Sequence, residues 1–376
     1  IVARFYELVR EDEVLRPRRP VAVCGTHGKT TTTALTAFVL DRCGLAPGFL
    51  IGGQPKGFEH SARLGAVGAP FVIEGDEYDT AFFDKRAKFL HYLPEIAVVT
   101  SVEFDHGDVY RDLPEIERAF QRMLRQIPAD GLLLACVDND AVKLVPHAFS
   151  RVETYGFSDG ATWRGVPYAA EAGIRLVVLH NEEEWTEFDC PMAGLHNAQN
   201  ALAAVAVAAT LGADPGAVAE AVATFPGVAR RMEVFHETGG ATFVDDFAHH
   251  PTAIRETIAA ARMRWPGRRL RVLVEPRSNT TTTNLFQAAL AEAFQGADEV
   301  WLGPIYRAER IPETERLDRQ SVAARLSSHC VPTRVSDDIP ALAEEVLRSV
   351  RPGDVVLVLS NGAFGGIYDL FRSGGR

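Results

Sequence analysis

Residues 20–40 read PVAVCGTHGKTTTTALTAFVL, a pattern that predicts a strand, a glycine-rich turn and a helix in that order. Residues 21–24 form a short apolar run, and from Lys29 onward the apolar residues recur at helical spacing. The glycines of the turn let the backbone approach an anion, and the amides at the start of the helix point towards it. The stretch therefore predicts a phosphate-binding loop that opens an α/β domain.

Two side chains of this loop suit a nucleotide phosphate and its metal ion. Lys29 can reach the terminal phosphates, and the Thr30 hydroxyl can ligate Mg²⁺. Gly25 and Gly28 stand closer together than the glycines of a standard P-loop, so the motif alone is weak. The strand before it and the helix after it favour nucleotide binding over the alternative, a plain βα turn.

Composition limits the class of protein. A chain of 376 residues that is 47% apolar has room for two domains. Its formal charge of −11 argues against a nucleic-acid partner, which requires a basic face. No apolar run reaches the roughly 20 residues of a membrane span. The five cysteines lack metal or disulfide spacing. We expect a soluble, cytoplasmic monomer or weak homo-oligomer.

Polar residues follow two further predicted strands. Glu74 opens an acidic cluster after the strand at residues 71–73, and His106 follows the strand at 96–100. The carboxyl ends of parallel strands converge on one edge, so these side chains and Thr30 should meet there. Mg²⁺ prefers oxygen ligands, so we expect His106 to serve a second metal or to act through water. A solvated acidic loop and a capping histidine are the alternatives.

The rest of the chain predicts two kinds of α/β structure. Residues 151–189 alternate short apolar runs with turns, typical of a small antiparallel sheet attached to the first domain. After a hinge at 225–231, βα alternation predicts a Rossmann-like second domain. The expected divisions are a linker or remnant of a missing domain at 1–19, an ATP-binding domain at 20–228 and a C-terminal domain at 229–376.

Polar clusters follow strands of the second domain as well. Asp246, His249 and His250 come after the strand at residues 242–245. Paired histidines after paired aspartates suggest a metal site, and capping of the next helix is the alternative. Arg277 and Asn279 follow the next strand, where a ligand of this domain should lie. An arginine there suits a ligand that carries carboxylates.

The order of these clusters resembles the Mur ligases, ATP-dependent amide-forming enzymes of peptidoglycan synthesis, from residue 20 to the C-terminus. The resemblance implies ATP and Mg²⁺ as cofactors, with a nucleotide site formed by Gly25, Thr26, His27, Gly28, Lys29, Thr30, Thr31, His196, Asn197, Asn200, Arg231 and Asp246. It implies metal ligation by Thr30, Glu74 and His106. It implies catalytic roles for Lys29, Glu74, His106, Arg231, His249 and His250, with the acceptor held by His249, Arg277 and Asn279.

The runs at residues 77–86, 246–252 and 275–280 resemble the branch that joins L-alanyl-γ-D-glutamyl-meso-diaminopimelate to UDP-N-acetylmuramate in peptidoglycan recycling. The implied reaction passes through an acyl phosphate that the peptide amine attacks. The alternatives are the branch that adds L-alanine, a nucleotide-binding protein that does not ligate, and folylpolyglutamate synthase-like ligation. Family members carry an N-terminal domain for the UDP-sugar, so we expect this chain to be a fragment that binds ATP without appreciable ligation.

Overall fold

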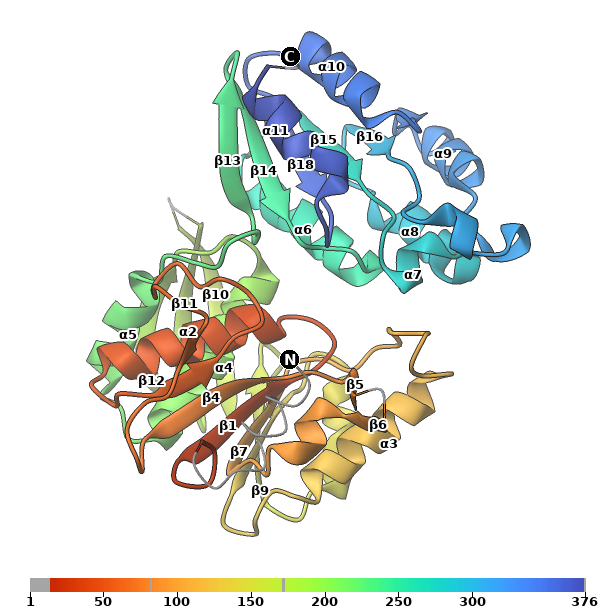
Figure 1. Ribbon diagram of the computed structural model, residues 1–376. Coiled ribbons are helices and arrows are strands. Elements are labelled where there is room, and N and C mark those ends of the chain that lie inside the picture. Colours follow the sequence, from red (N-terminus) through yellow and green to blue (C-terminus); the bar gives the residue numbers. More distant parts are fainter. Residues whose placement is uncertain (1–13, 82, 171–172, 375–376) are drawn as a thin grey trace. The chain divides into compact units, whose positions relative to one another are not determined.

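The computed structural model describes residues 14–81, 83–170 and 173–374. The chain divides into two units, Ile1–Ala229 and Arg230–Arg376, and each has its own sheet (Figure 1). Most of residues 1–19, for which the sequence predicts a linker or a remnant of a missing domain, lies outside the described residues. Among the described residues, no helix is both long enough and apolar enough to cross a membrane.

The first unit is organised around strand β1, whose last four residues are fully buried. An apolar run without alternation is typical of a parallel strand covered on both faces, and β1 pairs in parallel with a strand on each side. Across the sheet the strands are β12 (Glu183–Cys190), β11 (Gly173–His180), β10 (Trp163–Ala170), β9 (Arg151–Gly156), β8 (Leu132–Cys136), β7 (Ile96–Val99), β1 (Arg19–Cys24), β4 (Pro70–Gly75), β2 (Gly48–Leu50) and β3 (Ala62–Arg63).

The antiparallel strands predicted after residue 151 do form, and they continue the main sheet. Strand β9 pairs in parallel with β8, and β10 pairs in parallel with β9. Beyond β10 the direction changes, because the β10–β11 and β11–β12 pairs are antiparallel. The main sheet of the first unit therefore has ten strands with antiparallel pairs at both ends, since β2 and β3 at the other end are also antiparallel.

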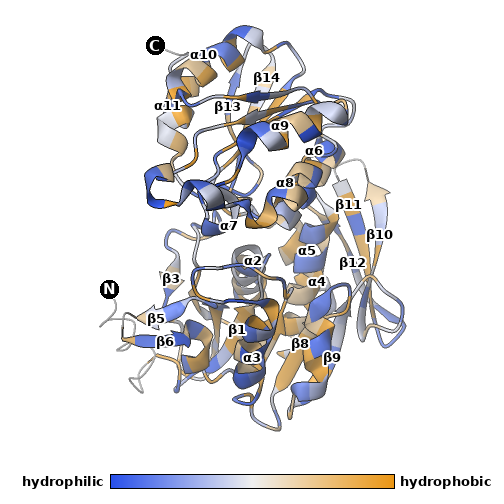
Figure 2. Cartoon of the chain, turned by 90° about the vertical axis from the view of Figure 1, so that its right-hand side faces the viewer, coloured by the Kyte–Doolittle hydropathy of each residue, from blue (hydrophilic) through white to orange (hydrophobic). Residues whose placement is uncertain are grey.

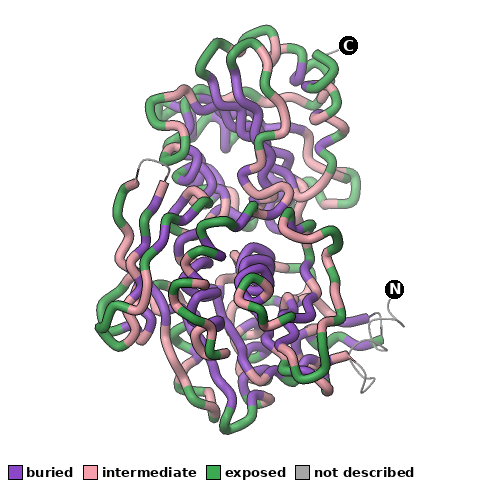
Figure 3. The backbone as a smooth tube through the Cα atoms, turned by 90° about the vertical axis from the view of Figure 1, so that its left-hand side faces the viewer, coloured by how far each residue is buried: buried purple, intermediate pink, exposed green. Residues whose placement is uncertain are grey.

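Helix α2 (Lys29–Arg42) is buried from Thr30 to Leu40. It packs against the alanine-rich helix α4 (Leu195–Thr210), whose small side chains allow a close approach, and against α5 (Pro215–Ala223). Apolar residues gather along the central strands (Figure 2), and these strands are mostly buried (Figure 3). The remaining elements are β5 (Asp79–Ala81), β6 (Asp84–Ala87), α3 (Leu113–Leu124) and the 3₁₀ helices Lys88–His91 and Asp140–His147.

The second unit contains a six-stranded sheet in which only one strand is antiparallel to its neighbour. Parallel strands joined by helices are the Rossmann-like pattern predicted from the sequence, so the predicted fold class is confirmed. Across the sheet the strands are β13 (Glu233–Thr238), β14 (Ala241–Asp246), β18 (Val355–Leu359), β15 (Leu270–Val274), β16 (Glu299–Leu302) and β17 (Thr333–Val335).

The helices of the second unit differ in part from the sequence prediction, which places helices at residues 251–263, 285–294, 321–326 and 340–350. The helix expected at 285–294 is divided into the 3₁₀ helix Asn284–Phe286 and α8 (Gln287–Ala293), and a short helix α7 (Asn279–Thr282) precedes it. Ser278 caps α7 by accepting from the Thr281 amide. The other helices are α6 (Pro251–Arg264), α9 (Arg319–Ser328), α10 (Ile339–Ser349), α11 (Ile367–Arg372) and the 3₁₀ helices Ala308–Arg310, Glu313–Glu315 and Phe364–Gly366.

Candidate active site

The glycine-rich loop joins β1 to α2 at the carboxyl edge of the first sheet. Gly28 is the N-cap of α2, with a left-handed φ of 80°, and Gly25 has a φ of 130°. A β-carbon on Gly25 would lie 2.2 Å from Thr100 Oγ1, and one on Gly28 would lie 2.5 Å from Asn200 Oδ1. Both positions therefore require glycine for backbone conformation and for space. The loop amides that follow can approach an anion closely.

Lys29 extends from the first turn of α2 to a buried carboxylate. Its Nζ donates to the Gly25 carbonyl at 2.5 Å and lies 2.9 Å from Oε1 and 2.8 Å from Oε2 of Glu77. Burial alone would lower the pKa of Lys29, but the Glu77 carboxylate offsets this and the pKa is raised. The lysine is therefore fully charged at neutral pH.

His106 meets the same carboxylate from the loop after β7. Its Nε2 lies 2.9 Å from Glu77 Oε1, and the Tyr78 ring packs on the imidazole at 4.2 Å between centroids. Burial lowers the pKa of His106, but the hydrogen bond to Glu77 and the negative charges of Glu77 and Asp105 together outweigh it, and the pKa is raised. Tyr110 also fixes this segment, because its hydroxyl donates to the Glu77 carbonyl at 2.5 Å.

Thr30 and Glu74 lie together, as the sequence predicted for the carboxyl edge. The Thr30 hydroxyl donates to Glu74 Oε1 at 2.8 Å, and the Gly52 amide donates to Glu74 Oε2 at 2.7 Å. A hydroxyl and a carboxylate beside a phosphate loop are the oxygen donors that Mg²⁺ prefers. This pair therefore fits a magnesium ion. The His106–Glu77 pair does so less well in this conformation, because the Lys29 ammonium already neutralises the carboxylate.

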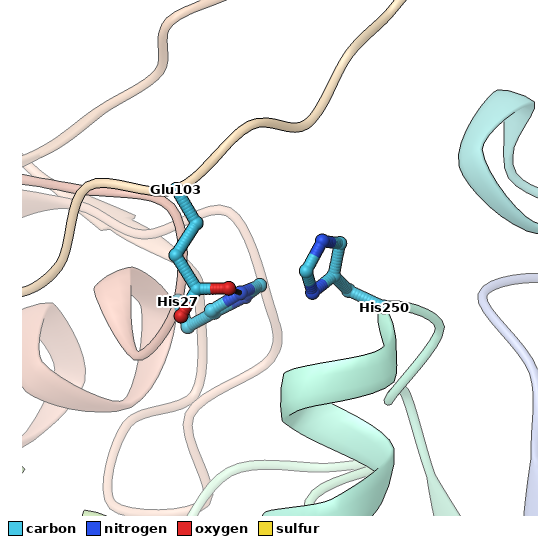
Figure 4. A group of neighbouring side chains, drawn as sticks. All are labelled: His27, Glu103 and His250. Carbon is cyan, nitrogen blue, oxygen red and sulfur yellow. Dashed lines mark ion pairs between the residues drawn. The ribbon is translucent and has the colours of Figure 1, made fainter. Parts of the chain in front are cut away.

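Thr26 and His27 connect the loop to the segment after β7. The Glu103 amide donates to Thr26 Oγ1 at 2.9 Å, and the His27 amide donates to Ser101 Oγ at 2.9 Å. The His27 imidazole Nε2 lies 3.6 Å from Glu103 Oε2, and the two side chains lie next to each other in Figure 4. These contacts fix the first half of the loop.

The start of α4 supports the loop from its other side. Asn200 Oδ1 accepts from the Thr32 hydroxyl at 3.1 Å, and its Nδ2 donates to Asn197 Oδ1 at 3.3 Å. Asn197 in turn donates to the Ala193 carbonyl at 2.8 Å. Both asparagines are buried, whereas His196 on the same turn is partly exposed. The two asparagines therefore hold α4 against α2, and their nucleotide contacts stay a prediction.

In the second unit, the adjacent arginines Arg230 and Arg231 have different surroundings. Arg230 Nε donates to Asp245 Oδ2 at 2.9 Å, and its Nη2 donates to the Ser360 carbonyl at 2.7 Å. The Arg231 guanidinium lies over the Phe247 ring at 5.0 Å. Arg230 therefore ties the start of this unit to its sheet, and the nucleotide contact expected of Arg231 stays a prediction.

Asp246, at the end of β14, is engaged by its own unit. Its Oδ2 accepts from the Met232 amide at 2.8 Å, and its Oδ1 accepts from the Ala248 amide at 2.9 Å. Burial raises the pKa of Asp246, although the Arg231 charge and these amides act in the opposite direction. The carboxylate organises the turn after β14, and its contact with the nucleotide stays a prediction.

The two histidines after Asp246 hydrogen-bond differently. His250 is the N-cap of α6, and its Nδ1 accepts from the Thr252 amide at 3.3 Å. His249 Nδ1 lies 2.9 Å from the Phe247 carbonyl oxygen, which can only accept. His249 therefore carries its proton on Nδ1 and a lone pair on Nε2 in the neutral form. His250 has the opposite tautomer.

Arg277 and Asn279 both follow β15. The Arg277 guanidinium lies 3.6 Å from the centre of the Tyr306 ring, and its Nη1 donates to Glu275 Oε1 at 3.4 Å. Asn279 is the first residue of α7, and its side chain is exposed. Both predicted acceptor residues therefore stand at the carboxyl edge of the second sheet.

Sequence reasoning missed Glu77, which binds Lys29 and His106 at the centre of the site. It is one of four acidic residues within the six residues after Ile73, and nothing in their order distinguishes the buried one. Tyr306 was also missed, because it lies in the loop after β16, distant in the sequence from Arg277. Ser360 belongs to a polar cluster that the sequence shows at a strand end, but no role was predicted for it. The only signal for Ser360 was its place directly after the strand that ends at Leu359.

Comparison with known proteins assigns the family. Residues 23–208 match the Mur ligase middle domain, and residues 230–362 match the Mur ligase glutamate ligase domain. The chain is 39% identical over 367 residues to UDP-N-acetylmuramate--L-alanyl-gamma-D-glutamyl-meso-2,6-diaminoheptandioate ligase of Escherichia coli (strain K12), covering 96% of this chain and 77% of that protein. It is 36% identical over 365 residues to UDP-N-acetylmuramate--L-alanine ligase of Roseiflexus castenholzii, covering 92% and 74%.

Solved structures agree with the sequence comparison. The crystal structure of a murein peptide ligase from Psychrobacter arcticus 273-4 matches with a TM-score of 0.72 at 31% identity, covering 99% of this chain and 80% of that one. A phosphate loop with Lys29, an oxygen pair suited to magnesium and a match to both domains of one family all point the same way. The chain belongs to the Mur ligase family, the ATP-dependent enzymes that form amide bonds, as its sequence predicted.

Proposed function

We propose that the protein joins L-alanyl-γ-D-glutamyl-meso-diaminopimelate to UDP-N-acetylmuramate at the expense of ATP, in peptidoglycan recycling in the cytoplasm. The observation that carries this proposal is the Lys29, Thr30 and Glu74 arrangement in a chain 39% identical to a ligase of that name. Arg277 at the carboxyl edge of the second sheet supports an acceptor that bears carboxylates.

In the first step the muramoyl carboxylate takes the ATP γ-phosphoryl group, the β–γ phosphoanhydride bond breaks and ADP leaves, and the resulting acyl phosphate has a reactive carbonyl carbon. The amides after Gly28 hold the phosphates, and Lys29 exchanges Glu77 for phosphate oxygens and balances their charge. Arg231 adds a second positive charge. Bound at Thr30 and Glu74, Mg²⁺ would neutralise phosphate oxygens.

The second step is attack of the peptide amine on the acyl phosphate, which forms the amide bond and releases phosphate. The amine must lose a proton, and an imidazole titrates in the right range to take it. His249 is the better base of the two histidines, because its Nε2 carries the lone pair while His250 uses Nδ1 to cap α6. Arg277, with Asn279 beside it, holds a carboxylate of the acceptor.

The second candidate is ligation of L-alanine, favoured by relatives of that name at 36–37% identity. The test incubates the full-length protein with ATP, Mg²⁺, UDP-N-acetylmuramate and either the tripeptide or L-alanine. Phosphate release and the product mass are measured. Product with the tripeptide and none with L-alanine is the expected result. The reverse result would establish the alanine ligase instead, and ATP hydrolysis without either product would refute ligation.

A further inference from the structure

Arg277 is held on two sides before any acceptor is present. On one side, its guanidinium carbon lies 3.6 Å from the centre of the Tyr306 ring. The Tyr306 amide donates to the Pro276 carbonyl at 2.9 Å, which fixes the ring beside the end of β15. On the other side, Nη1 donates to Glu275, which is only 4% exposed. Stacking and a charge-assisted hydrogen bond together select one arginine conformation.

Gly362, in the loop after β18, forms a third side. A β-carbon on this glycine would lie 2.1 Å from Nε and 2.3 Å from Cζ of Arg277. Gly362 is not among the glycines with a left-handed φ, so its backbone suits alanine as well. The position therefore needs glycine for space alone, and the space that it leaves is filled by the arginine.

Hydrogen bonds place this glycine accurately against the arginine. The Gly362 amide donates to Ser360 Oγ at 2.9 Å, and the Ser360 hydroxyl donates to Glu275 Oε2 at 2.5 Å. Ser360 is fully buried. The carboxylate that binds Arg277 thus also fixes the loop that packs against it. The loops after β15 and β18 form one connected support.

Arg277 still has donors for a ligand. A quarter of its side chain is exposed, and within the described residues its Nε and Nη2 atoms donate no hydrogen bond. A guanidinium presents donors in a planar fork that matches a carboxylate. Because the side chain is already ordered, binding an anion would cost little further conformational entropy.

We propose that Gly362 and Tyr306 are positioning residues that set the Arg277 guanidinium for a carboxylate of the acceptor peptide. This inference rests on the proposed ligation of a peptide acceptor. It assigns acceptor affinity to a glycine and an aromatic ring that act through the arginine.

Gly362→Ala tests the inference, because the added methyl group collides with a flexible side chain and leaves the strands unchanged. The KM for the tripeptide should rise about 10- to 100-fold, the range expected for losing one charge-assisted hydrogen bond. The KM values for ATP and UDP-N-acetylmuramate should change less than about twofold. Arg277→Ala should give at least as large a rise in tripeptide KM.

The double variant Gly362→Ala/Arg277→Ala separates positioning from general disruption. If the glycine acts through the arginine, the double variant should have the tripeptide KM of Arg277→Ala alone. Tyr306→Leu should raise the same KM, whereas Tyr306→Phe, which keeps the aromatic face, should not. The comparison of Tyr306→Leu with Tyr306→Phe keeps the inference testable if Gly362→Ala fails to fold.

The inference would be overturned if the rise in tripeptide KM of the double variant equalled the product of the rises in the two single variants. An unchanged tripeptide KM in both Gly362→Ala and Tyr306→Leu would also overturn it. If the wild-type protein ligates the tripeptide in the same assay, the proposed function stands while this inference falls. A wild type that neither ligates nor binds the tripeptide in calorimetry would instead refute the proposed function, and the inference with it.

Discussion

Lys29 Nζ and the Glu77 carboxylate lie 2.8 Å apart, with only 13% and 3% of the two side chains exposed. The lysine that the loop offers to a phosphate is therefore already paired with a buried anion. Removing the lysine alone would leave that anion without its main counter-charge. From sequence alone, Lys29 would be taken for an exposed loop residue with little effect on stability, and the structure corrects this.

Lys29→Ala should abolish phosphoryl transfer and also lower the free energy of unfolding, by about 1–3 kcal/mol for a buried group left unsatisfied. Lys29→Ala/Glu77→Gln should recover most of that stability without recovering turnover, because no buried charge is stranded. Chemical denaturation and phosphate release measure the two effects. Turnover in either variant would exclude Lys29 from the phosphoryl-transfer step.

Glu77→Gln should lower the pKa of His106 in metal-free protein, because the carboxylate is what raises it against the effect of burial. The folded pKa lies above the unfolded value of about 6.5. The stability that this ion pair contributes is therefore complete below about pH 6.5 and is lost as the pH rises through the raised pKa. Histidine NMR titration of both proteins measures the change. An unchanged His106 titration curve in Glu77→Gln would show that Glu77 does not raise the pKa of His106.

Glu74→Gln should raise the Mg²⁺ concentration needed for half-maximal ATP turnover, by about tenfold or more. A neutral amide supplies less charge to a hard cation, and it cannot accept from both Thr30 and Gly52 as the carboxylate does. Glu59→Gln is the matched control, since the Glu59 side chain is 89% exposed and the same charge is removed. Equal Mg²⁺ titrations in the two variants would make Glu74 a structural residue.

Arg230→Ala should mainly lower stability, whereas Arg231→Ala should mainly lower activity. Loss of Arg230 breaks its contacts with Asp245 and Ser360 and should cost about 1–3 kcal/mol in the free energy of unfolding. Loss of Arg231 should lower kcat about 100-fold or more with a smaller effect on stability, as expected for a group that stabilises transferring charge. Thermal denaturation and steady-state kinetics of both variants decide this. If Arg231→Ala lowered the free energy of unfolding but left kcat unchanged, Arg231 would not be the residue that contacts phosphate.

His249→Gln should lower kcat by about 10²-fold or more, the usual contribution of a general base. His250→Asn should retain most activity, because asparagine is a good N-cap and keeps an acceptor for the Thr252 amide. Initial rates are measured from pH 6 to 9, a range around the imidazole pKa. The fall in rate towards acidic pH should disappear only in the His249 variant. The reverse pattern would make His250 the base.

Local patterns made much of this site predictable. The strand, turn and helix around Lys29 are encoded by consecutive residues, and the Thr30–Glu74 pair follows from the rule that parallel strands end at one edge. Glu77 was not predictable, because which member of an acidic run points inward depends on packing against Lys29 and His106. The position of β9 beside β8 was equally hidden, since strand pairing is non-local. The capping signal at Ser278 was present in the sequence, and it would have identified α7.

Strand β12 lies at one end of the ten-stranded sheet, so within the described part of the chain one of its edges has no partner. Such an edge is a template for pairing with another copy. Glu183, Glu184 and Glu187 lie exposed along this strand. A second β12 would bring like charges against them and would have to desolvate both sets. The acidic edge therefore opposes edge-to-edge aggregation of this strand at neutral pH.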